Sequence, residues 1–187
     1  MGEDKGLIQH GLKTWSKNIA NLLSLLLPEC YISIRQEQYP YYKIFFNKDE
    51  IIFDENDIAI EGPLRGLLSA HKIYPEKNWL VIACDMIDIN QNIITNLINR
   101  FSDDPGYDHY LYKSENNLEP LCAIYKGQGL SRIFETAKNS RNFSLQKNLP
   151  LEKCSILVAE KEDIRRLKSI NTKEDLNHLF SGGERHA

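Results

Sequence analysis

An unbroken apolar run that ends in an acidic residue is the feature that most constrains how this chain folds. The run extends from Leu80 to Cys84 and is followed directly by Asp85. Apolar runs of this length are typical of strands that are covered on both faces, as in a parallel sheet. Open α/β sheets bind their ligands beyond the carboxyl ends of such strands. Asp85 is therefore the first candidate functional residue, although its position fits equally well with a cap on the turn into the next helix.

Strand-like runs and helical patterns alternate along the rest of the chain. Helices are indicated where apolar residues recur at intervals of three and four. The predicted helices are Trp15 to Leu26 (capped by Thr14 and stopped by Pro28), a short helix near Pro40, Pro63 to His71, Asn90 to Phe101, Leu130 to Ala137 and Lys173 to Phe180 (capped by Thr172 with Asp175). The predicted strands are Cys30 to Ile34, Glu50 to Phe53, Leu80 to Cys84, Tyr107 to Lys113, Leu121 to Tyr125 and Cys154 to Ala159.

This alternation predicts a three-layer α/β/α sandwich with a mostly parallel sheet. Tyr107 to Lys113 and Leu121 to Tyr125 are separated by a polar turn and are expected to form a hairpin arm or an antiparallel edge. The first three strands are expected to be parallel neighbours. In that arrangement Asp54 and Asp85 follow the ends of strands on the same side of the sheet, so both should open onto one crevice.

Length and composition set outer limits on the kind of protein. The chain has 187 residues, of which 42% are hydrophobic and 26% charged, and we expect one domain over residues 1–187 with a frayed polar tail at 181–187. No apolar run approaches the roughly 20 residues that span a bilayer. The charged segment Met1 to Lys5 lacks the apolar core of a signal peptide. The expected location is the cytoplasm, without a membrane partner.

Charge and cysteine usage narrow the partners and the chemistry further. A net charge of −3 and a pI near 6.0 argue against a general nucleic-acid binder, so small ligands or protein partners are favoured. The four cysteines, at 30, 84, 122 and 154, are spread singly and are expected to be reduced core thiols. The five histidines show no paired spacing that would indicate a zinc site.

Acidic residues at strand ends are the remaining candidates for chemistry. Asp54, Asp85 and Asp88 could bind Mg²⁺, which takes one or two carboxylates together with water and phosphate oxygens. The alternative is that each residue only terminates a strand. Lys5 could neutralise a phosphate, although a lysine in this position also fits an ordinary surface residue. No Gly-x-Ser-x-Gly elbow is present, so the residues indicate chemistry by positioning and a metal, as in nucleotidyl or phosphoryl transfer.

Five segments resemble, in order and approximate spacing, those of the molybdenum cofactor guanylyltransferases, which are MobA-like NTP transferases. They are Met1-Gly-Glu-Asp-Lys-Gly-Leu7, Asp54 followed by Glu61-Gly-Pro-Leu-Arg-Gly66, Leu80-Val-Ile-Ala-Cys-Asp-Met86, Glu119-Pro-Leu-Cys-Ala-Ile-Tyr125 and Ile170-Asn-Thr-Lys-Glu-Asp-Leu176. The resemblance implies a nucleotide-diphospho-sugar-transferase-like, Rossmann-like fold. It also implies transfer of GMP from GTP to molybdopterin with release of pyrophosphate.

The same resemblance implies roles for four residues. Lys5 matches a catalytic lysine that contacts the nucleotide, and Asp85 matches the aspartate that holds Mg²⁺ beside the nucleotide. Asp54 matches a nucleotide-binding aspartate. Ser33 lies where the family often has a nucleotide-binding asparagine. The implied partners are GTP and molybdopterin as substrates and, further on, molybdoenzyme-maturation proteins.

Two departures from the family pattern qualify these expectations. The family has a buried strand and a Leu-Ala-Gly-Gly loop ahead of the Met-Gly-x-Asp-Lys segment, and this sequence starts at that segment. Backbone amides of the glycine loop cradle phosphates, so we expect weak GTP binding together with two open strand edges and partly exposed core. The second departure is Ile87, where the family usually has proline.

Other functions remain open. One is a relative that uses another nucleotide, such as a cytidylyltransferase for the same cofactor or a sugar-phosphate nucleotidyltransferase. A different class of function is a degenerate, non-catalytic domain that binds a protein of the cofactor pathway. An in-frame Leu-Ala-Gly-Gly segment upstream of Met1 would favour the enzyme, and its absence would favour the binding domain.

Overall fold

The computed structural model describes residues 4–58, 60–115, 117–140, 143–172 and 175. The helices are α1 (Trp15–Ser24), α2 (Tyr39–Tyr42), α3 (Pro63–Ile73), α4 (Gln91–Asp103), α5 (Gly127–Ser140), α6 (Leu145–Asn148) and α7 (Lys161–Arg166). Short 3-10 turns cover Lys5–Leu7, Gln36–Gln38, Lys48–Glu50 and Leu151–Lys153. The strands are β1 (Gln9–His10), β2 (Lys13–Thr14), β3 (Ile32–Ile34), β4 (Ile51–Phe53), β5 (Trp79–Ile82), β6 (His109–Ser114), β7 (Asn117–Tyr125) and β8 (Cys154–Val158).

The largest sheet has four strands in the order β5-β7-β6-β8. β7 is antiparallel to β5 and to β6, whereas β6 and β8 are parallel, so β7 alone runs against the common direction. The hairpin expected from the two runs after Tyr107 is formed by β6 and β7. β3 and β4 form a separate parallel pair in which Ser33 lies opposite Ile52.

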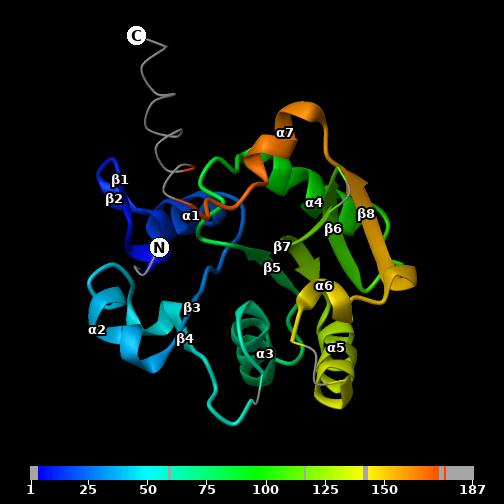
Figure 1. The fold of residues 1–187 in the computed structure, drawn as a ribbon, viewed down its shortest axis with the longest axis horizontal. Helices are drawn as coiled ribbons and strands as arrows, with labels where there is room; N and C mark the ends of the chain where they lie inside the picture. The colour runs from blue at the N-terminus through cyan, green and yellow to red at the C-terminus, as the bar shows by residue number, and fades with distance from the viewer. Residues whose placement is uncertain (1–3, 59, 116, 141–142, 173–174, 176–187) are drawn as a thin grey trace.

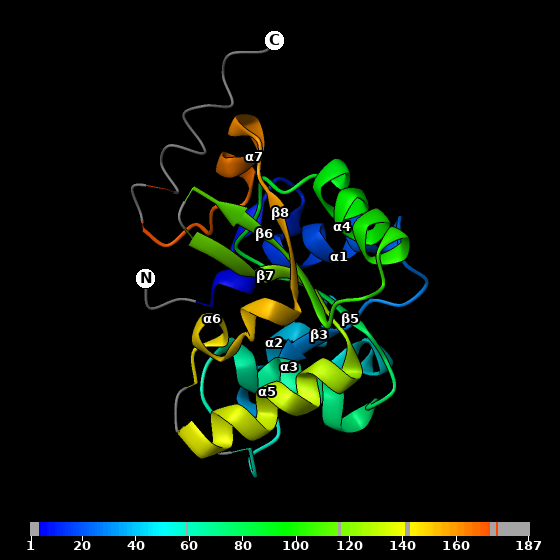
Figure 2. The same ribbon diagram turned by 90° about the vertical axis from the view of Figure 1, so that its right-hand side faces the viewer.

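Helices cover both faces of the large sheet, which gives the predicted three layers (Figures 1 and 2). Side chains alternate along β7 because successive residues of a strand point to opposite faces. Cys122 and Ile124 pack in one apolar cluster with α1 and α4. Ala123 and Tyr125 pack in another cluster with α3 and α5. A third, smaller cluster holds α2 against the β3–β4 pair.

Local signals in the sequence explain where the main helices begin. The Thr14 hydroxyl accepts a hydrogen bond from the Lys17 amide at the start of α1, and the Asn90 side chain does the same for the Ile93 amide of α4. Such caps satisfy amide groups that have no partner within the helix. α3 begins at Pro63, directly after Gly62 with its positive φ of 71°. These starts confirm the sequence prediction.

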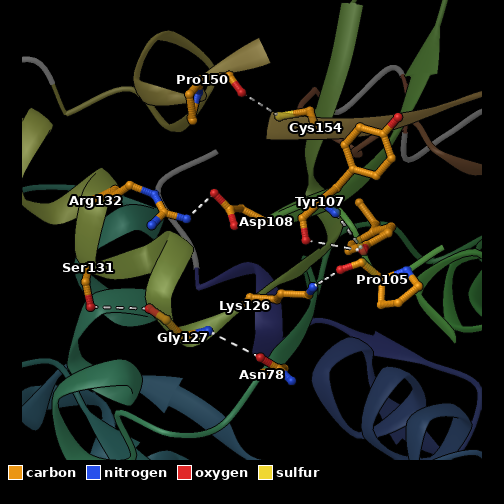
Figure 3. Close-up of polar contacts among 11 residues, drawn as sticks. Asn78, Pro105, Tyr107, Asp108, Lys126, Gly127, Ser131, Arg132, Pro150 and Cys154 are labelled. Carbon is orange, nitrogen blue, oxygen red and sulfur yellow. Dashed lines mark hydrogen bonds and ion pairs between the residues drawn. The ribbon is translucent and has the colours of Figure 1, made fainter. Parts of the chain in front are cut away.

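Polar contacts fix the start of α5 to the edge of the sheet (Figure 3). The Asn78 side chain accepts a hydrogen bond of 3.3 Å from the Gly127 amide. Lys126 donates to the carbonyl oxygen of Pro105, and Arg132 pairs with the nearly buried Asp108. These contacts lie at the end of β7 where the strand finishes, opposite to the end that Asp85 occupies.

One prediction about the sheet is wrong. The runs at Cys30 to Ile34 and Glu50 to Phe53 do form parallel neighbours, but β5 pairs with β7 and with neither of them in the part of the chain that the structure describes. β5 and β3 cannot pair because a cavity lies between them. In agreement with this, all four residues of β5 are partly exposed. Among the described residues, β5 therefore has a strand partner on one edge only, and so does β3.

The described helices include none that is both long and apolar enough to cross a membrane. Apart from Asp175, the predicted helix Lys173 to Phe180 and the tail at 181–187 lie outside the described residues. The four cysteines are free thiols, as predicted.

Candidate functional site

A cavity of about 700 Å³ separates β3 from β5. Four of the five residues that the sequence singled out for chemistry line it, namely Lys5, Ser33, Asp54 and Asp85. Asp54 and Asp85 thus open onto one cavity, as predicted, although their strands are not neighbours. Asp88 does not join them and lies 3.8 Å from Arg165 instead.

Lys5 is held between two oxygen atoms at the rim of this cavity. Its Nζ lies 2.7 Å from Oδ2 of Asp85 and donates a hydrogen bond of 2.6 Å to Oδ1 of Asn171. The Asp85 side chain is 13% exposed and that of Lys5 27%, so the pair is largely shielded from water. The other carboxylate oxygen of Asp85, Oδ1, is buried and has no hydrogen-bond partner among the described residues.

Asp4 positions Lys5 by anchoring the short 3-10 turn in which Lys5 lies. One Asp4 oxygen accepts hydrogen bonds from the Gly6 amide at 3.0 Å and the Tyr42 hydroxyl at 2.9 Å. The other accepts from Gln38. Gly6 packs so closely on Tyr42 that a Cβ would collide with the hydroxyl. Burial, reinforced by the Asp4 charge, raises the pKa of Tyr42, so this hydroxyl stays a hydrogen-bond donor.

Asn171 reaches the site because the segment around it is fixed by two sets of hydrogen bonds. The Ile170 amide donates to the backbone oxygen of Asp85 at 3.0 Å. The Asp175 carboxylate accepts from the Asn171 and Thr172 amides, and the Asp175 amide donates to the Thr172 hydroxyl. The cap predicted from Thr172 and Asp175 is therefore formed. Asn171 itself was missed as a site residue, although it lies in the segment Ile170 to Leu176 that resembles the family.

Ser33 and Asp54 form a second pair on the β3–β4 side of the cavity. The Ser33 hydroxyl donates to Oδ1 of Asp54 at 2.7 Å. Gly66 of α3 lies directly against this pair, since a Cβ built on it would be 2.6 Å from the Ser33 Oγ. Only glycine lets the helix backbone approach so closely. The loop before α3 and Arg65 also line the cavity.

The cysteine at the site is not poised for nucleophilic chemistry. Burial and, to a smaller extent, the neighbouring Asp85 charge raise the pKa of the Cys84 thiol to about 12. A thiol must be deprotonated to attack or to bind a metal. Within the residues that the structure describes, no three or more His, Cys, Asp and Glu side chains come together as a metal cluster. A metal here would depend on Asp85, Asn171 and oxygens brought by a ligand.

An α/β sandwich that gathers acidic and basic side chains at its strand ends over a cavity has the architecture of a nucleotide-binding protein. The chain belongs to the MobA-like NTP transferase domain family, whose pattern matches residues 1–152.

Two curated relatives illustrate the family. The chain is 27% identical over 179 residues to the molybdenum cofactor biosynthesis bifunctional protein of Synechocystis, which covers 96% of this chain and 50% of that protein. It is 30% identical over 130 residues to a probable molybdenum cofactor guanylyltransferase of Clostridium perfringens, covering 66% of this chain and 64% of the relative. The chain thus spans about half of the first relative and less than two thirds of the second.

The fold resembles a solved structure over nearly its full length. The crystal structure of molybdopterin-guanine dinucleotide biosynthesis protein A from Archaeoglobus fulgidus matches with a TM-score of 0.75 and 19% identity. The match covers 97% of this chain and 92% of that one. This likeness confirms the predicted fold, which is that of the nucleotide-diphospho-sugar transferases.

Proposed function

We propose that the chain transfers GMP from GTP to molybdopterin and releases pyrophosphate. The observation that carries the proposal is the group formed by Lys5, Asp85 and Asn171, which places one cation and two oxygen ligands at the rim of a cavity beyond a strand end. Family membership and the names of the relatives support the same reaction. The proposed setting is the cytoplasm, with molybdoenzyme-maturation proteins as recipients of the product.

The residues present fit a magnesium ion. Oδ1 of Asp85 is buried without a partner among the described residues. The amide oxygen of Asn171 lies close to this carboxylate, because Lys5 Nζ donates hydrogen bonds both to it and to Oδ2 of Asp85. Mg²⁺ prefers oxygen ligands and retains water and phosphate oxygens, so it does not need a larger cluster of protein ligands. We propose that Asp85, with Asn171 beside it, holds Mg²⁺. When bound, this ion would stabilise negative charge on the phosphates.

Lys5 and the opposite wall of the cavity then have separate tasks. A terminal phosphate oxygen of molybdopterin attacks the α-phosphorus of GTP in line, and the bond to the β-phosphate breaks so that pyrophosphate leaves. Lys5 offsets the charge that builds up on the leaving group. Ser33 and Asp54 bind the nucleoside part, for which the Asp54 carboxylate is a hydrogen-bond acceptor. No side-chain nucleophile is required.

The test is a direct assay of the product. The purified chain is incubated with Mg²⁺, molybdopterin and either GTP or CTP, and the dinucleotide and pyrophosphate are quantified by mass spectrometry and a coupled assay. GMP transfer that depends on Lys5 and Asp85 would support the proposal. Preferential use of CTP would point to the cytidylyltransferase. Binding of cofactor without any transfer would instead support the non-catalytic domain.

A further inference from the structure

β8 forms an edge of the four-stranded sheet and carries apolar side chains that the rest of the fold does not cover. Among the strands that the structure describes, it pairs with β6 alone. It lies at the outer edge of the sheet in Figure 1 and faces the viewer in Figure 2. The Val158 side chain is 78% exposed and that of Ile156 39%, and Leu151 just before the strand is exposed as well. Large exposed apolar side chains thus gather at this edge.

The backbone of β8 turns hydrogen-bonding groups to the same edge. The carbonyl of Lys153 and the amide of Ala159 both face β6. Backbone groups alternate in direction along a strand, so residues 154, 156 and 158 turn theirs to the free edge. The Cys154 amide already donates within the turn before the strand. The Cys154 carbonyl and both groups of Ile156 and Val158 have no partner strand within the described part of the chain.

The edge lacks the devices that usually keep strands from pairing between molecules. Natural edge strands are protected by proline, by charged side chains, by bulges or by being very short. β8 reads Cys-Ser-Ile-Leu-Val, without a charge or a proline, and its register with β6 is continuous over all five residues. An apolar, regular and unprotected edge of this kind is a surface that another strand can join.

β8 is complementary to itself. Two identical edges related by a two-fold axis run antiparallel, and an axis at Ile156 places that residue opposite its own copy and Cys154 opposite Val158. The free backbone groups then form about four hydrogen bonds between the two strands. A register shifted by two residues in either direction would instead place Glu152 opposite Val158 or Glu160 opposite Cys154. The sequence of the strand therefore favours the register centred on Ile156.

The charges at the two ends of β8 are complementary in the same arrangement. Glu152 and Lys153 lie just before the strand, Glu160 and Lys161 follow it closely, and all four residues are exposed. The two-fold axis brings the start of one strand beside the end of the other. Glu152 then lies near Lys161 of the second copy, and Lys153 lies near Glu160 of the second copy. Opposite charges thus meet at both ends of the paired strands.

We propose that β8 is an interface between two copies of this chain, which pair antiparallel across Ile156 and join their four-stranded sheets into one continuous sheet. The two Ile156 side chains cover each other, and Val158 of each copy covers Cys154 of the other on the same face of the sheet. β8 and β5 lie at opposite edges of the sheet, so the cavity with Lys5 and Asp85 stays open in the dimer. This inference does not depend on the proposed transferase activity.

The first test measures the mass of the purified chain by sedimentation equilibrium at concentrations from about 5 to 500 µM. We expect the mass to rise with concentration from one chain toward two and to stop there, because a two-fold interface is closed. A mass of one chain at every concentration would overturn the proposal and leave the edge to a different partner. Growth beyond two chains would show open-ended adhesion and overturn it as well.

Amide hydrogen exchange of the unaltered chain locates the interface. At the high concentration, exchange at Ile156 and Val158 should slow about 10-fold, because their amides become paired between the copies. Exchange at Leu80 of β5, at the other edge of the sheet, should not change. Slowing at another surface without slowing at β8 would place the dimer elsewhere and contradict the proposal. Since no substitution is needed, this measurement decides the question even where a variant fails to fold.

Two substitutions test the edge and the position of the axis. Val158→Lys places a charge on the edge and should weaken dimerisation about 10-fold or more, whereas Leu25→Lys, at a position 73% exposed just beyond α1, should not. Ile156→Cys should form a disulfide between copies under mild oxidation with air, because opposite Cα atoms in such a pair are about 5.5 Å apart. Equal dimerisation of the two lysine variants, or crosslinking of Leu25→Cys to the same extent as Ile156→Cys, would contradict the proposal.

A charge exchange tests the antiparallel direction. Glu152→Lys and Lys161→Glu should each weaken dimerisation about 3-fold, because like charges then meet at the ends of the strands. The double variant restores opposite charges, so its affinity should return to that of the unaltered chain. Losses that add up in the double variant would show that the two residues do not face each other and would contradict this arrangement.

Discussion

Lys5 can stay bound to Asp85 and still contact a phosphate. Its ammonium group has three donors, of which Asp85 and Asn171 use two. A triphosphate can therefore recruit Lys5 without dismantling the cluster, and Oδ1 of Asp85 stays available as a ligand. These contacts predict that the negative charge of Asp85 matters more to catalysis than to folding.

Asp85→Asn should lower GMP transfer by at least about 100-fold, because it removes the only charge in the proposed metal ligands. The free energy of unfolding should change by about 1 kcal/mol or less, since the amide preserves the shape and Lys5 can turn to water. Transfer rates and urea unfolding of the same preparations measure the two effects. Asp88→Asn is the matched control and should keep its activity. A large loss of stability with undiminished activity per folded molecule would mean that Asp85 only caps its turn.

Gly66→Ala should weaken nucleotide binding through Ser33. The added methyl group would lie 2.6 Å from the Ser33 Oγ and 3.3 Å from Oδ1 of Asp54, so the pair must shift. We expect the KM for GTP to rise about 10-fold while kcat changes less, since overpacking of this kind costs about 1–3 kcal/mol. Steady-state kinetics with GTP varied measure this split.

A second substitution tests whether Gly66→Ala acts by crowding the Ser33 hydroxyl or by disturbing α3 elsewhere. In the double variant Gly66→Ala with Ser33→Ala, the hydroxyl that causes the collision is gone, so the two effects on KM should be less than additive. Strictly additive effects would show that Gly66 acts elsewhere in α3.

Four of the five candidate site residues predicted from the sequence lie together, and Asp88 is the exception. Lys5, Ser33, Asp54 and Asp85 were named by strand ends or by the family resemblance, and all line the same cavity. Asp4 and Asn171 were missed, because their contributions depend on contacts across 38 and 166 positions of the chain. No periodicity in the sequence reports such contacts. The family-like segment around Asn171 was the one available signal.

At the scale of elements, local signals were reliable and strand pairing was not. Caps at Thr14 and Asn90, the stop near Pro28 and the β6–β7 hairpin all follow from neighbouring residues. The placement of β5 beside β3 was wrong, because an apolar run shows that a strand is covered without showing which strand it pairs with. β7, with nine residues, provides that partner.

The packing of β6 against α5 predicts a loss of stability in acid. His109 is fully buried between the Tyr125 ring and Gly129, and neither ring nitrogen has a partner among the described residues. Burial lowers the pKa of His109 to about 4. The Asp108 charge opposes this shift, and the Arg132 charge contributes to it. The unfolded chain therefore binds this proton below about pH 6.5 while the folded chain does not until about pH 4, so stability falls across that window by about 3 kcal/mol.

Urea unfolding at several pH values between 4 and 7.5 measures this dependence. His109→Leu removes the titrating group and should flatten the curve in that window, whereas His10→Leu should leave it unchanged because that residue is exposed. An unaltered pH dependence in His109→Leu would assign the acid sensitivity to other groups.

In the whole molecule, the cavity between β3 and β5 lies between two sheets that differ in how well they are packed. β6 is paired on both edges and fully buried along most of its length. β3 and β4 are paired only with each other, and their apolar cluster has four fully buried members against fourteen beneath α3 and α5. Fewer buried contacts and open edges are the features of regions that open before the rest of a protein.

Amide hydrogen exchange in the free chain should therefore separate the two sheets. We expect the protected amides of β3 and β4 to exchange on the order of 100-fold faster than those of β6, because they open locally while β6 requires global unfolding. The measurement is exchange followed by NMR or mass spectrometry at low denaturant. If β3, β4 and β6 exchanged at one common rate, the two sheets would form a single cooperative unit and the prediction would be wrong.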